Sequence, residues 1–415
     1  MGKNEQKPAI RFQGFTDAWE QRKVGEVSKR VIVGLATSVT PYYREEGVPI
    51  LRNLNIKENY LDDTDILFLD RPYAESQVSK QIHAGDVLTV HTGYIGISCV
   101  VPEKYDNCLT FTTLITTTDD AVLEGAFLAQ YLNSEIGMSA VQAVTTQGGR
   151  QNLNTNDFVK VEIRYPSLAE QSKICAVLSR IDNLITLHQR KYDKLVNIKK
   201  SMLEKMFPRD GASVPEIRFS GFTDPWEQRK LSELAEIVGG GTPDTNNSAY
   251  WDGDIDWYAP AEMEGQRYAV SSVRKITELG LQKSSAKMLP AHRTVLFTSR
   301  AGIGKMAILQ RPAATNQGFQ SLVLRDGIDP YFIYSMGDKI KGIAEGVASG
   351  STFLEISGKM LGSLEVMTPS IEEQKEIASF FRGIDDLITL HQREQIFINL
   401  EVHDVRSGKK HRFIL

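Results

Sequence analysis

The most constraining feature of this sequence is that two of its segments occur twice. Residues 10–27 and 217–234 agree at 13 of 18 positions, and residues 167–190 and 370–393 agree at 13 of 24, at offsets of 207 and 203 residues. These offsets are far longer than the roughly 20–50 residues of a solenoid repeat. The intervening stretches have similar lengths but almost no alignable identity. The pattern therefore indicates that a unit of one domain and one helix was duplicated. The repeated segments, here called the frame, are similar in the two copies, whereas the stretches between them, here called the inserts, differ.

The longer repeated segment predicts a long helix in each copy. A Ser-x-x-Glu capping box opens the two copies, at Ser167 and at Ser370. Apolar residues then follow at alternating spacings of four and three, as in a coiled coil. About 40 residues at 1.5 Å each give a rod of roughly 60 Å, which needs a partner helix to be stable in water. The expected seam consists of Ile174, Leu178, Ile181, Ile185, His188, Tyr192, Leu195, Lys199, Met202 and Met206, facing Ile377, Phe381, Ile384, Ile388 and His391.

Two features of the repeats have both a functional and a structural interpretation. His188 and His391 occupy the same place in the two LITLHQR motifs and could form a metal or pH-sensitive site. The spacing favours polar seam residues that fix helix register, because no other ligand is near either histidine, and no metal site is predicted. Trp19 and Trp226 in the shorter repeat could stack on bases. A structural staple is favoured, because a surface that reads sequence should differ between the copies.

Each insert is expected to be a compact α+β domain. Short β-branched runs alternate with Gly, Pro, Asn and Asp, and weaker helical runs lie at 126–134 and 331–339. One local correspondence survives, because GDVLTVHTGYIG (85–96) and RTVLFTSRAGIG (293–304) both place a strand before a glycine-containing turn with a polar tip. Further polar segments precede the last strand of each insert. Arg pairs with guanine, and Asn or Gln with adenine, so such loops are candidates for reading bases.

Composition and motifs exclude several other functions. The 48 Lys+Arg and 52 Asp+Glu residues give a formal charge of −4, which excludes a polybasic coat that binds nucleic acid by charge alone. The three cysteines are too scattered for a disulfide framework or a zinc finger. The run from Ser299 to Met306 lacks the first glycine and the Ser or Thr of a P-loop. No protease, hydrolase, kinase or adenine-methyltransferase motif occurs. The absence of these motifs predicts a binding protein. The N-terminal residues contain no apolar signal core and no stretch approaches 18 apolar residues, so a soluble, cytoplasmic protein is expected.

This arrangement resembles the DNA-specificity subunits of type I restriction-modification enzymes. The residues that carry the resemblance are the LITLHQR helices after YPSLAEQ and TPSIEEQ, the repeated IRFxGFTDxWEQRK segment and the GDVLTVHTGYIG turn. The resemblance covers nearly the whole chain and rests on order and duplication. It implies an α+β fold class, with two α+β target-recognition domains separated by two long antiparallel coiled-coil helices with pseudo-twofold symmetry.

The duplication and the resemblance together divide the chain into five parts. These are a first target-recognition domain with the N-terminal repeat at 1–166, a central helix at 167–208, a second target-recognition domain at 209–369, a distal helix at 370–405 and a divergent tail at 406–415.

The resemblance further implies a DNA-binding role without catalysis. Each recognition domain would read one half of a bipartite target in double-stranded DNA, and the helices would set the gap. Two modification (methyltransferase) subunits would dock on the helices, and restriction subunits would join them. S-adenosylmethionine, ATP and Mg²⁺ would bind those partners, so no cofactor and no membrane association is expected for this chain. A rod of the expected length also spans more than one DNA turn of about 34 Å.

The second copy departs from the first after Arg393. The first copy continues KYDKLVNIKKSMLEKMFP, whereas the second continues EQIFINLEVHDVRSGKKHRFIL, in which Ser407 and Gly408 are expected to break the helix. We expect this change to weaken assembly with one modification subunit.

Two other functions remain open. One is a single-chain DNA methyltransferase or nuclease that carries a duplicated recognition module. It would need a catalytic domain, which is disfavoured because the two repeated units account for nearly all of the 415 residues. A coiled-coil scaffold that binds only protein would show no sequence-dependent retention of DNA.

The residues expected to bind DNA come from the polar loops of both inserts, and none is expected to be catalytic. The expected base contacts are His91, Thr92, Tyr94, Gln147, Arg150, Gln151 and Asn152 in the first insert and Ser299, Arg300, Lys305, Gln317, Ser351 and Thr352 in the second. The expected phosphate contacts are Lys80, Lys287 and Arg293.

Overall fold

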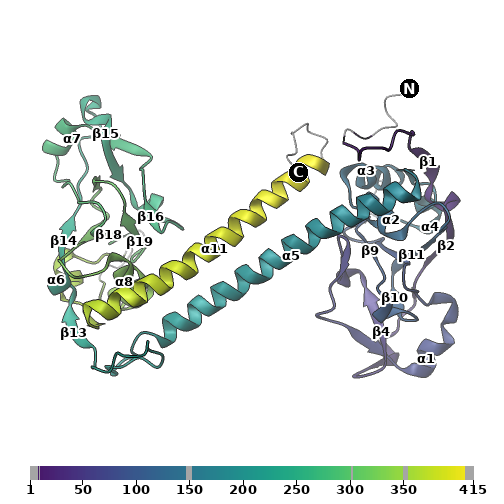
Figure 1. The fold of residues 1–415 in the computed structure, drawn as a ribbon, viewed down its shortest axis with the longest axis horizontal. Helices are drawn as coiled ribbons and strands as arrows, with labels where there is room; N and C mark the ends of the chain where they lie inside the picture. The colour runs from purple at the N-terminus through teal and green to yellow at the C-terminus, as the bar shows by residue number, and fades with distance from the viewer. Residues whose placement is uncertain (1–7, 9, 146–151, 301, 349–353, 407–415) are drawn as a thin grey trace. The chain divides into compact units, whose positions relative to one another are not determined.

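The computed structural model describes residue 8 and residues 10–145, 152–300, 302–348 and 354–406, with side chains described as far as Phe397. The chain divides into two compact units, one drawn from Met1–Leu187 and Glu394–Leu415 and the other comprising His188–Arg393. Each unit contains one insert, folded from short strands and short helices, and parts of two long helices, α5 (Leu168–Lys205) and α11 (Ile371–Arg406) (Figure 1).

The first unit is built around a four-stranded antiparallel sheet with strand order β2-β11-β8-β9. Its strands are β2 (Ser28–Val33), β11 (Thr113–Thr118), β8 (Val87–Val90) and β9 (Ser98–Val100). A second sheet has the order β10-β4-β7-β3 and contains one parallel pair, β10 with β4. Its strands are β10 (Leu109–Phe111), β4 (Val48–Arg52), β7 (Leu67–Leu69) and β3 (Tyr43–Arg44). The helices α2 (Gly125–Leu132), α3 (Glu135–Val144) and α4 (Thr155–Phe158) follow.

The second unit repeats this plan. Its main sheet has the order β14-β21-β18-β19-β16, and a smaller sheet has the order β17-β15-β20, in which β15 and β20 are parallel. The strands are β14 (Ala235–Gly239), β21 (Gln320–Leu324), β18 (Thr294–Phe297), β19 (Met306–Leu309), β16 (Tyr268–Ala269), β17 (Arg274–Ile276), β15 (Trp251–Tyr258) and β20 (Ala313–Thr315). The helices that follow are α8 (Pro330–Ser335), α9 (Gly337–Val347) and α10 (Gly358–Ser363).

The two inserts therefore share a common core topology although their sequences do not align, and the main sheet of the second insert has one further strand, β16. The order β2-β11-β8-β9 corresponds to β14-β21-β18-β19, and the parallel pair of β4 with β10 corresponds to that of β15 with β20. Short apolar runs specify both sheets, and central strands such as β8 and β18 are buried along their whole length, so apolar character rather than residue identity is what the two inserts share. The prediction of two α+β inserts is confirmed.

The shorter repeat forms the same ribbon in both units. Its EQRK residues are strand β1 (Glu20–Lys23), antiparallel to β12 (Glu162–Tyr165), and strand β13 (Glu227–Lys230), antiparallel to β22 (Glu365–Thr368). Trp226 is 3% exposed in the core of the second unit, and Trp19 packs against the core of the first. The interpretation as a structural staple is confirmed.

The capping-box glutamates have a different role from the predicted one. The Arg11 guanidinium donates to both carboxylate oxygens of Glu170, at 2.7 and 2.8 Å, and Arg218 donates to both of Glu373, at 2.7 Å each. Both glutamates are 1% exposed. These bidentate pairs tie the shorter repeat to the start of each long helix. The serine half of the box is present in the second copy, where Ser370 Oγ accepts from the Glu373 amide at 3.3 Å.

The two long helices run antiparallel within the second unit. His188 of α5 meets His391 of α11, and the Lys199 amine lies 2.7 Å from the Asp385 carboxylate. Beyond the end of α5, Phe207 stacks on Phe381 with ring centroids 6.0 Å apart. Residue numbers thus rise along one helix as they fall along the other. The antiparallel arrangement is confirmed for this part of the helices.

The apolar periodicity also identifies the inner face of the helices. The predicted seam residues of both helices are all buried or half-buried. Val177, Leu184, Leu187 and Val196, which flank the seam on α5, are between 38% and 47% exposed. In the part of the chain that the structure describes, no helix has both the length and the apolar character needed to cross a membrane.

Candidate nucleic-acid interface

In the first unit, the candidate surface is the turn that joins β8 to β9. Gly93 and Gly96 have φ angles of +85° and +94°, which glycine adopts readily, and the Gly96 amide donates to the Val90 carbonyl at 2.9 Å. Between these glycines, the Tyr94 side chain is 85% exposed. The turn therefore presents an aromatic ring to solvent from a backbone that is fixed at its base.

A second segment, distant in sequence, closes on this turn. The Leu153 amide donates to the His91 carbonyl at 2.9 Å, and a hydrogen bond of 2.9 Å joins His91 Nδ1 to Asn152 Oδ1. Thr92 forms an isolated antiparallel bridge with Asn152. Three residues predicted to contact bases are thus held in one cluster, although 61 residues separate His91 from Asn152.

The second unit has an equivalent turn between β18 and β19. The Gly304 amide donates to the Thr298 carbonyl at 3.0 Å, and Gly302 and Gly304 have φ angles of +98° and +87°. The Ile356 amide donates to the Ser299 carbonyl at 3.0 Å, in the same way that Leu153 bonds to His91. The correspondence predicted between residues 85–96 and 293–304 is confirmed in these backbone bonds.

The side chains on the two equivalent turns differ. Where the first turn has His91 and Thr92, the second has Ser299 and Arg300. Arg300 is half-buried, and the Lys305 amine lies 3.4 Å from the Glu264 carboxylate. The two turns therefore present different hydrogen-bonding groups from one backbone frame.

Some predicted contacts lie elsewhere or outside the described residues. Ser299 is fully buried, so its side chain lies behind the surface of the turn. Gln317 is exposed and accepts a hydrogen bond from the Thr242 hydroxyl. The residues Gln147, Arg150, Gln151, Ser351 and Thr352 lie outside the described part of the chain.

The three residues predicted to contact phosphate do not lie together beside the candidate turns. The Lys80 amine donates to the Val33 carbonyl at 2.7 Å. Arg293 donates to the Leu324 carbonyl at 2.9 Å and precedes β18, whereas the candidate turn follows that strand. Lys287 is exposed. The structure does not bring Arg293 to the end of β18 that carries the turn.

Sequence reasoning missed the residues that support the first turn. The Asn53 side-chain amide donates to Thr92 Oγ1 at 3.0 Å, and its carbonyl oxygen accepts from the Thr113 hydroxyl at 3.2 Å. Asn53 follows β4, far from the turn in sequence, and no local motif marks it. Only the pairing of the strands could have identified it.

The cysteines are unsuited to nucleophilic chemistry. Burial raises the pKa of the Cys99 thiol to about 12, that of Cys108 to about 11 and that of Cys175 to about 12. Thiols with such pKa values are protonated near neutral pH and are weak nucleophiles. Their place in the cores indicates a packing role.

The equivalent turns and the repeated helices define a protein built from two copies of one unit, each with an α+β domain and a long helix. A family model described as the type I restriction modification DNA specificity domain matches residues 16–197 and 223–400. The chain belongs to this family, and it is a type I restriction-modification specificity subunit with two such domains.

Individual relatives agree with this assignment. The chain is 38% identical over 168 residues to the type I restriction enzyme MjaIX specificity subunit of Methanocaldococcus jannaschii, a match covering 39% of this chain and 38% of that relative, well under two thirds of its length. It is 22% identical to the putative MjaX specificity subunit of the same organism over 91% of this chain and 89% of the relative. The crystal structure of a type I restriction-modification S subunit from M. genitalium has a TM-score of 0.62 at 13% identity, covering 98% of this chain and 99% of that one, so it shares the fold.

Proposed function

We propose that this chain selects the DNA sequence on which a type I restriction-modification complex acts. Each insert reads one half of a bipartite target in double-stranded DNA, and α5 and α11 set the gap between the halves. The chain itself is non-catalytic. It works in the cytoplasm, where the DNA of a bacterium or an archaeon lies.

The observation that carries this proposal is the pair of equivalent turns with unlike side chains. The hydrogen bonds from Leu153 to His91 and from Ile356 to Ser299 hold both turns in the same way. A catalytic or purely structural element that had been duplicated would need the same side chains in both copies. A pair of reading surfaces needs the same frame with different side chains, because the two halves of the target differ.

We assign the reading residues from the exposed groups of each unit. In the first insert they are His91, Thr92, Tyr94 and Asn152, together with Gln147, Arg150 and Gln151. In the second insert they are Arg300, Lys305 and Gln317, together with Ser351 and Thr352. Lys287 is the phosphate contact best supported by exposure, whereas Lys80 and Arg293 contact phosphate only if DNA competes with their carbonyl partners.

The long helices also offer the docking surface for partners. Leu184 and Leu187 on α5 are 47% and 46% exposed, and Leu387 and Leu390, their equivalents in the second repeat, are 46% and 48% exposed. Exposed apolar side chains that recur at equivalent positions suit two copies of one partner. We assign these surfaces to two modification subunits, which would bind S-adenosylmethionine. Restriction subunits, with ATP and Mg²⁺, would join that assembly.

The proposal is tested by changing one turn at a time in the assembled complex. Arg300→Ala should relax the choice of base in one half of the target and leave the other half unchanged, as measured by mapping methylated sites. Tyr94→Ala should alter only the other half. Lys287→Ala is the matched control, because loss of a phosphate contact weakens binding to all sequences about equally. Loss of specificity in both halves from either turn variant would contradict the assignment.

The alternative of a single-chain methyltransferase or nuclease is tested on the isolated chain. We expect no methyl transfer and no cleavage without partner subunits. Turnover by the purified chain alone would favour the alternative.

A further inference from the structure

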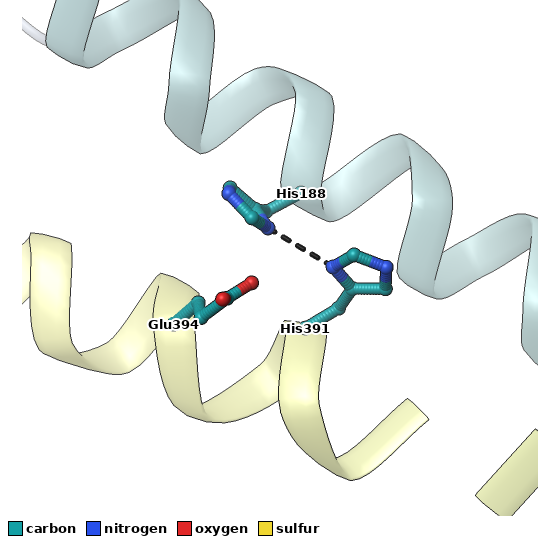
Figure 2. A group of neighbouring side chains, drawn as sticks. All are labelled: His188, His391 and Glu394. Atoms are coloured by element: carbon teal, nitrogen blue, oxygen red, sulfur yellow. Dashed lines mark hydrogen bonds between the residues drawn. The ribbon is translucent and has the colours of Figure 1, made fainter. Parts of the chain in front are cut away.

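The two histidines of the LITLHQR motifs face one another in the second unit. His188 of α5 and His391 of α11 are both half-buried, and their Nδ1 atoms are 3.0 Å apart. The ring centroids are 5.2 Å apart, and the ring planes are inclined by 51° (Figure 2). The sequence predicted no ligand near either histidine. That prediction is wrong because antiparallel packing brings together two residues that are 203 positions apart.

The separation of the two nitrogens is close to what a metal ion requires. Zinc binds histidine nitrogen at about 2.0–2.1 Å and prefers tetrahedral geometry, so two such nitrogens lie roughly 3.3–3.4 Å apart. The observed 3.0 Å differs from this by a few tenths of an ångström. A small change of side-chain torsion therefore suffices to place one cation between the rings.

A carboxylate lies one helical turn beyond the second histidine. Glu394 follows His391 by three residues on the continuous helix α11, so both side chains project from the same face (Figure 2). Together with His188 they form a group of two imidazoles and one carboxylate. Zinc accepts both ligand types, and a water molecule can complete a tetrahedral site.

The glutamate is peculiar to the second copy of the repeat. Arg393 is the last residue of the identical LITLHQR segment, and the next residue is Lys191 in the first copy but Glu394 in the second. A lysine at this place offers no metal ligand at neutral pH and adds a positive charge. The divergence of the second copy therefore begins with the change that supplies a third ligand.

We propose that His188, His391 and Glu394 bind one divalent transition-metal ion of the zinc type. The ion links α5 to α11 where His188 contacts His391, its equivalent in the second repeat. This role is independent of the DNA-reading proposal, since it requires neither DNA nor partner subunits.

The test uses the untagged full-length chain, freed of metal by chelation and titrated with Zn²⁺ by calorimetry. We expect one equivalent to bind per chain. His188→Gln, His391→Gln and Glu394→Lys should each weaken binding at least about tenfold. His292→Asn is the matched control, because His292 is exposed, has a φ of +60° that asparagine tolerates, and lies outside the group. Its binding isotherm should equal that of the wild-type chain.

A second readout separates loss of the site from loss of the fold. Zn²⁺ should raise the melting temperature of the wild-type and His292→Asn chains but not of Glu394→Lys, whose metal-free circular dichroism should match that of the wild type. Co²⁺ should give tetrahedral absorption bands that are absent from the His188→Gln/His391→Gln double variant. Absence of stoichiometric Zn²⁺ binding, or unchanged binding in the double variant, would overturn the proposal.

Discussion

At the scale of single residues, two buried arginine–glutamate pairs hold the repeated frame together. Glu170 and Glu373 are each 1% exposed and each accept two hydrogen bonds from one guanidinium. The hydrogen bond to Glu373 raises the pKa of Arg218. Both pairs join residues more than 150 positions apart, from the start of the shorter repeat to the start of a long helix. They explain why the two repeated segments occur together.

Removing one partner of such a pair should be costly. Arg218→Ala leaves an unpaired buried carboxylate, so we expect the free energy of unfolding of the second unit to fall by about 3–5 kcal/mol. Arg209→Ala is the control, because its pair with Glu216 is exposed and should contribute less than about 1 kcal/mol. Urea unfolding of both variants measures the difference. Addition of Glu373→Gln to Arg218→Ala should restore part of the loss, and equal effects of the two arginine substitutions would contradict this account.

Arg150, one of the proposed base contacts of the first insert, allows a sharper test of base recognition. Arg150→Ala should lower the affinity for the cognate target by about 1–3 kcal/mol and relax the choice of base at one position. Binding to a panel of single-base variants of the target measures both effects. If the substitution weakened binding equally to every variant of the target, Arg150 would be a phosphate contact and not a base contact.

Among the secondary-structure elements, the two long helices could be predicted from the sequence, but the aromatic contacts beyond the end of α5 could not. The seam spacing identified the inner face of both helices because coiled-coil packing depends on local periodicity alone. The same spacing could not show that Phe207, beyond the end of α5, packs against Trp226, Phe332 and Phe381. That contact joins three elements far apart in sequence, and only the folded chain defines it.

The inner and outer faces of α11 should respond differently to truncation. Ile384 is 7% exposed, so Ile384→Ala should lower the free energy of unfolding by about 2–5 kcal/mol. Leu387, three residues further on, is 46% exposed, so Leu387→Ala should change it by less than about 0.5 kcal/mol. If Leu387 contacts a modification subunit, its removal should weaken that binding by at least about 1 kcal/mol. Denaturant unfolding and a titration with the partner measure the two effects, and a stability loss at Leu387 equal to that at Ile384 would refute the division into faces.

At the scale of the whole molecule, duplication was the strongest signal in the sequence. It predicted two inserts on a repeated frame, and the equivalent strand orders of the two units agree with it. The common topology of the inserts was hidden, because sheets such as β2-β11-β8-β9 and β14-β21-β18-β19 depend on apolar pattern and tolerate different residues. The candidate turns were recognisable from glycine spacing. The residues that support these turns, such as Asn53, could not be recognised from the sequence, because only the pairing of strands brings them next to the turn.

If two modification subunits dock on the helices as proposed, the divergence after Arg393 should make their two sites unequal. The exposed leucines are the same in both repeats, but the residues that follow differ. We expect one modification subunit to bind more weakly, so that the complex loses one copy on dilution. Native mass measurement over a concentration series tests this expectation. Retention of two copies at the lowest protein concentration would count against it.

Two unlike domains that read two half-targets at a fixed separation should leave one pattern of methylation in the DNA of the cell. Methylated adenines can be mapped in DNA from cells that carry this chain and its partner subunits. We expect one bipartite sequence, with two different specified halves and an unspecified gap of constant length. A single continuous target, or halves separated by variable gaps, would contradict it.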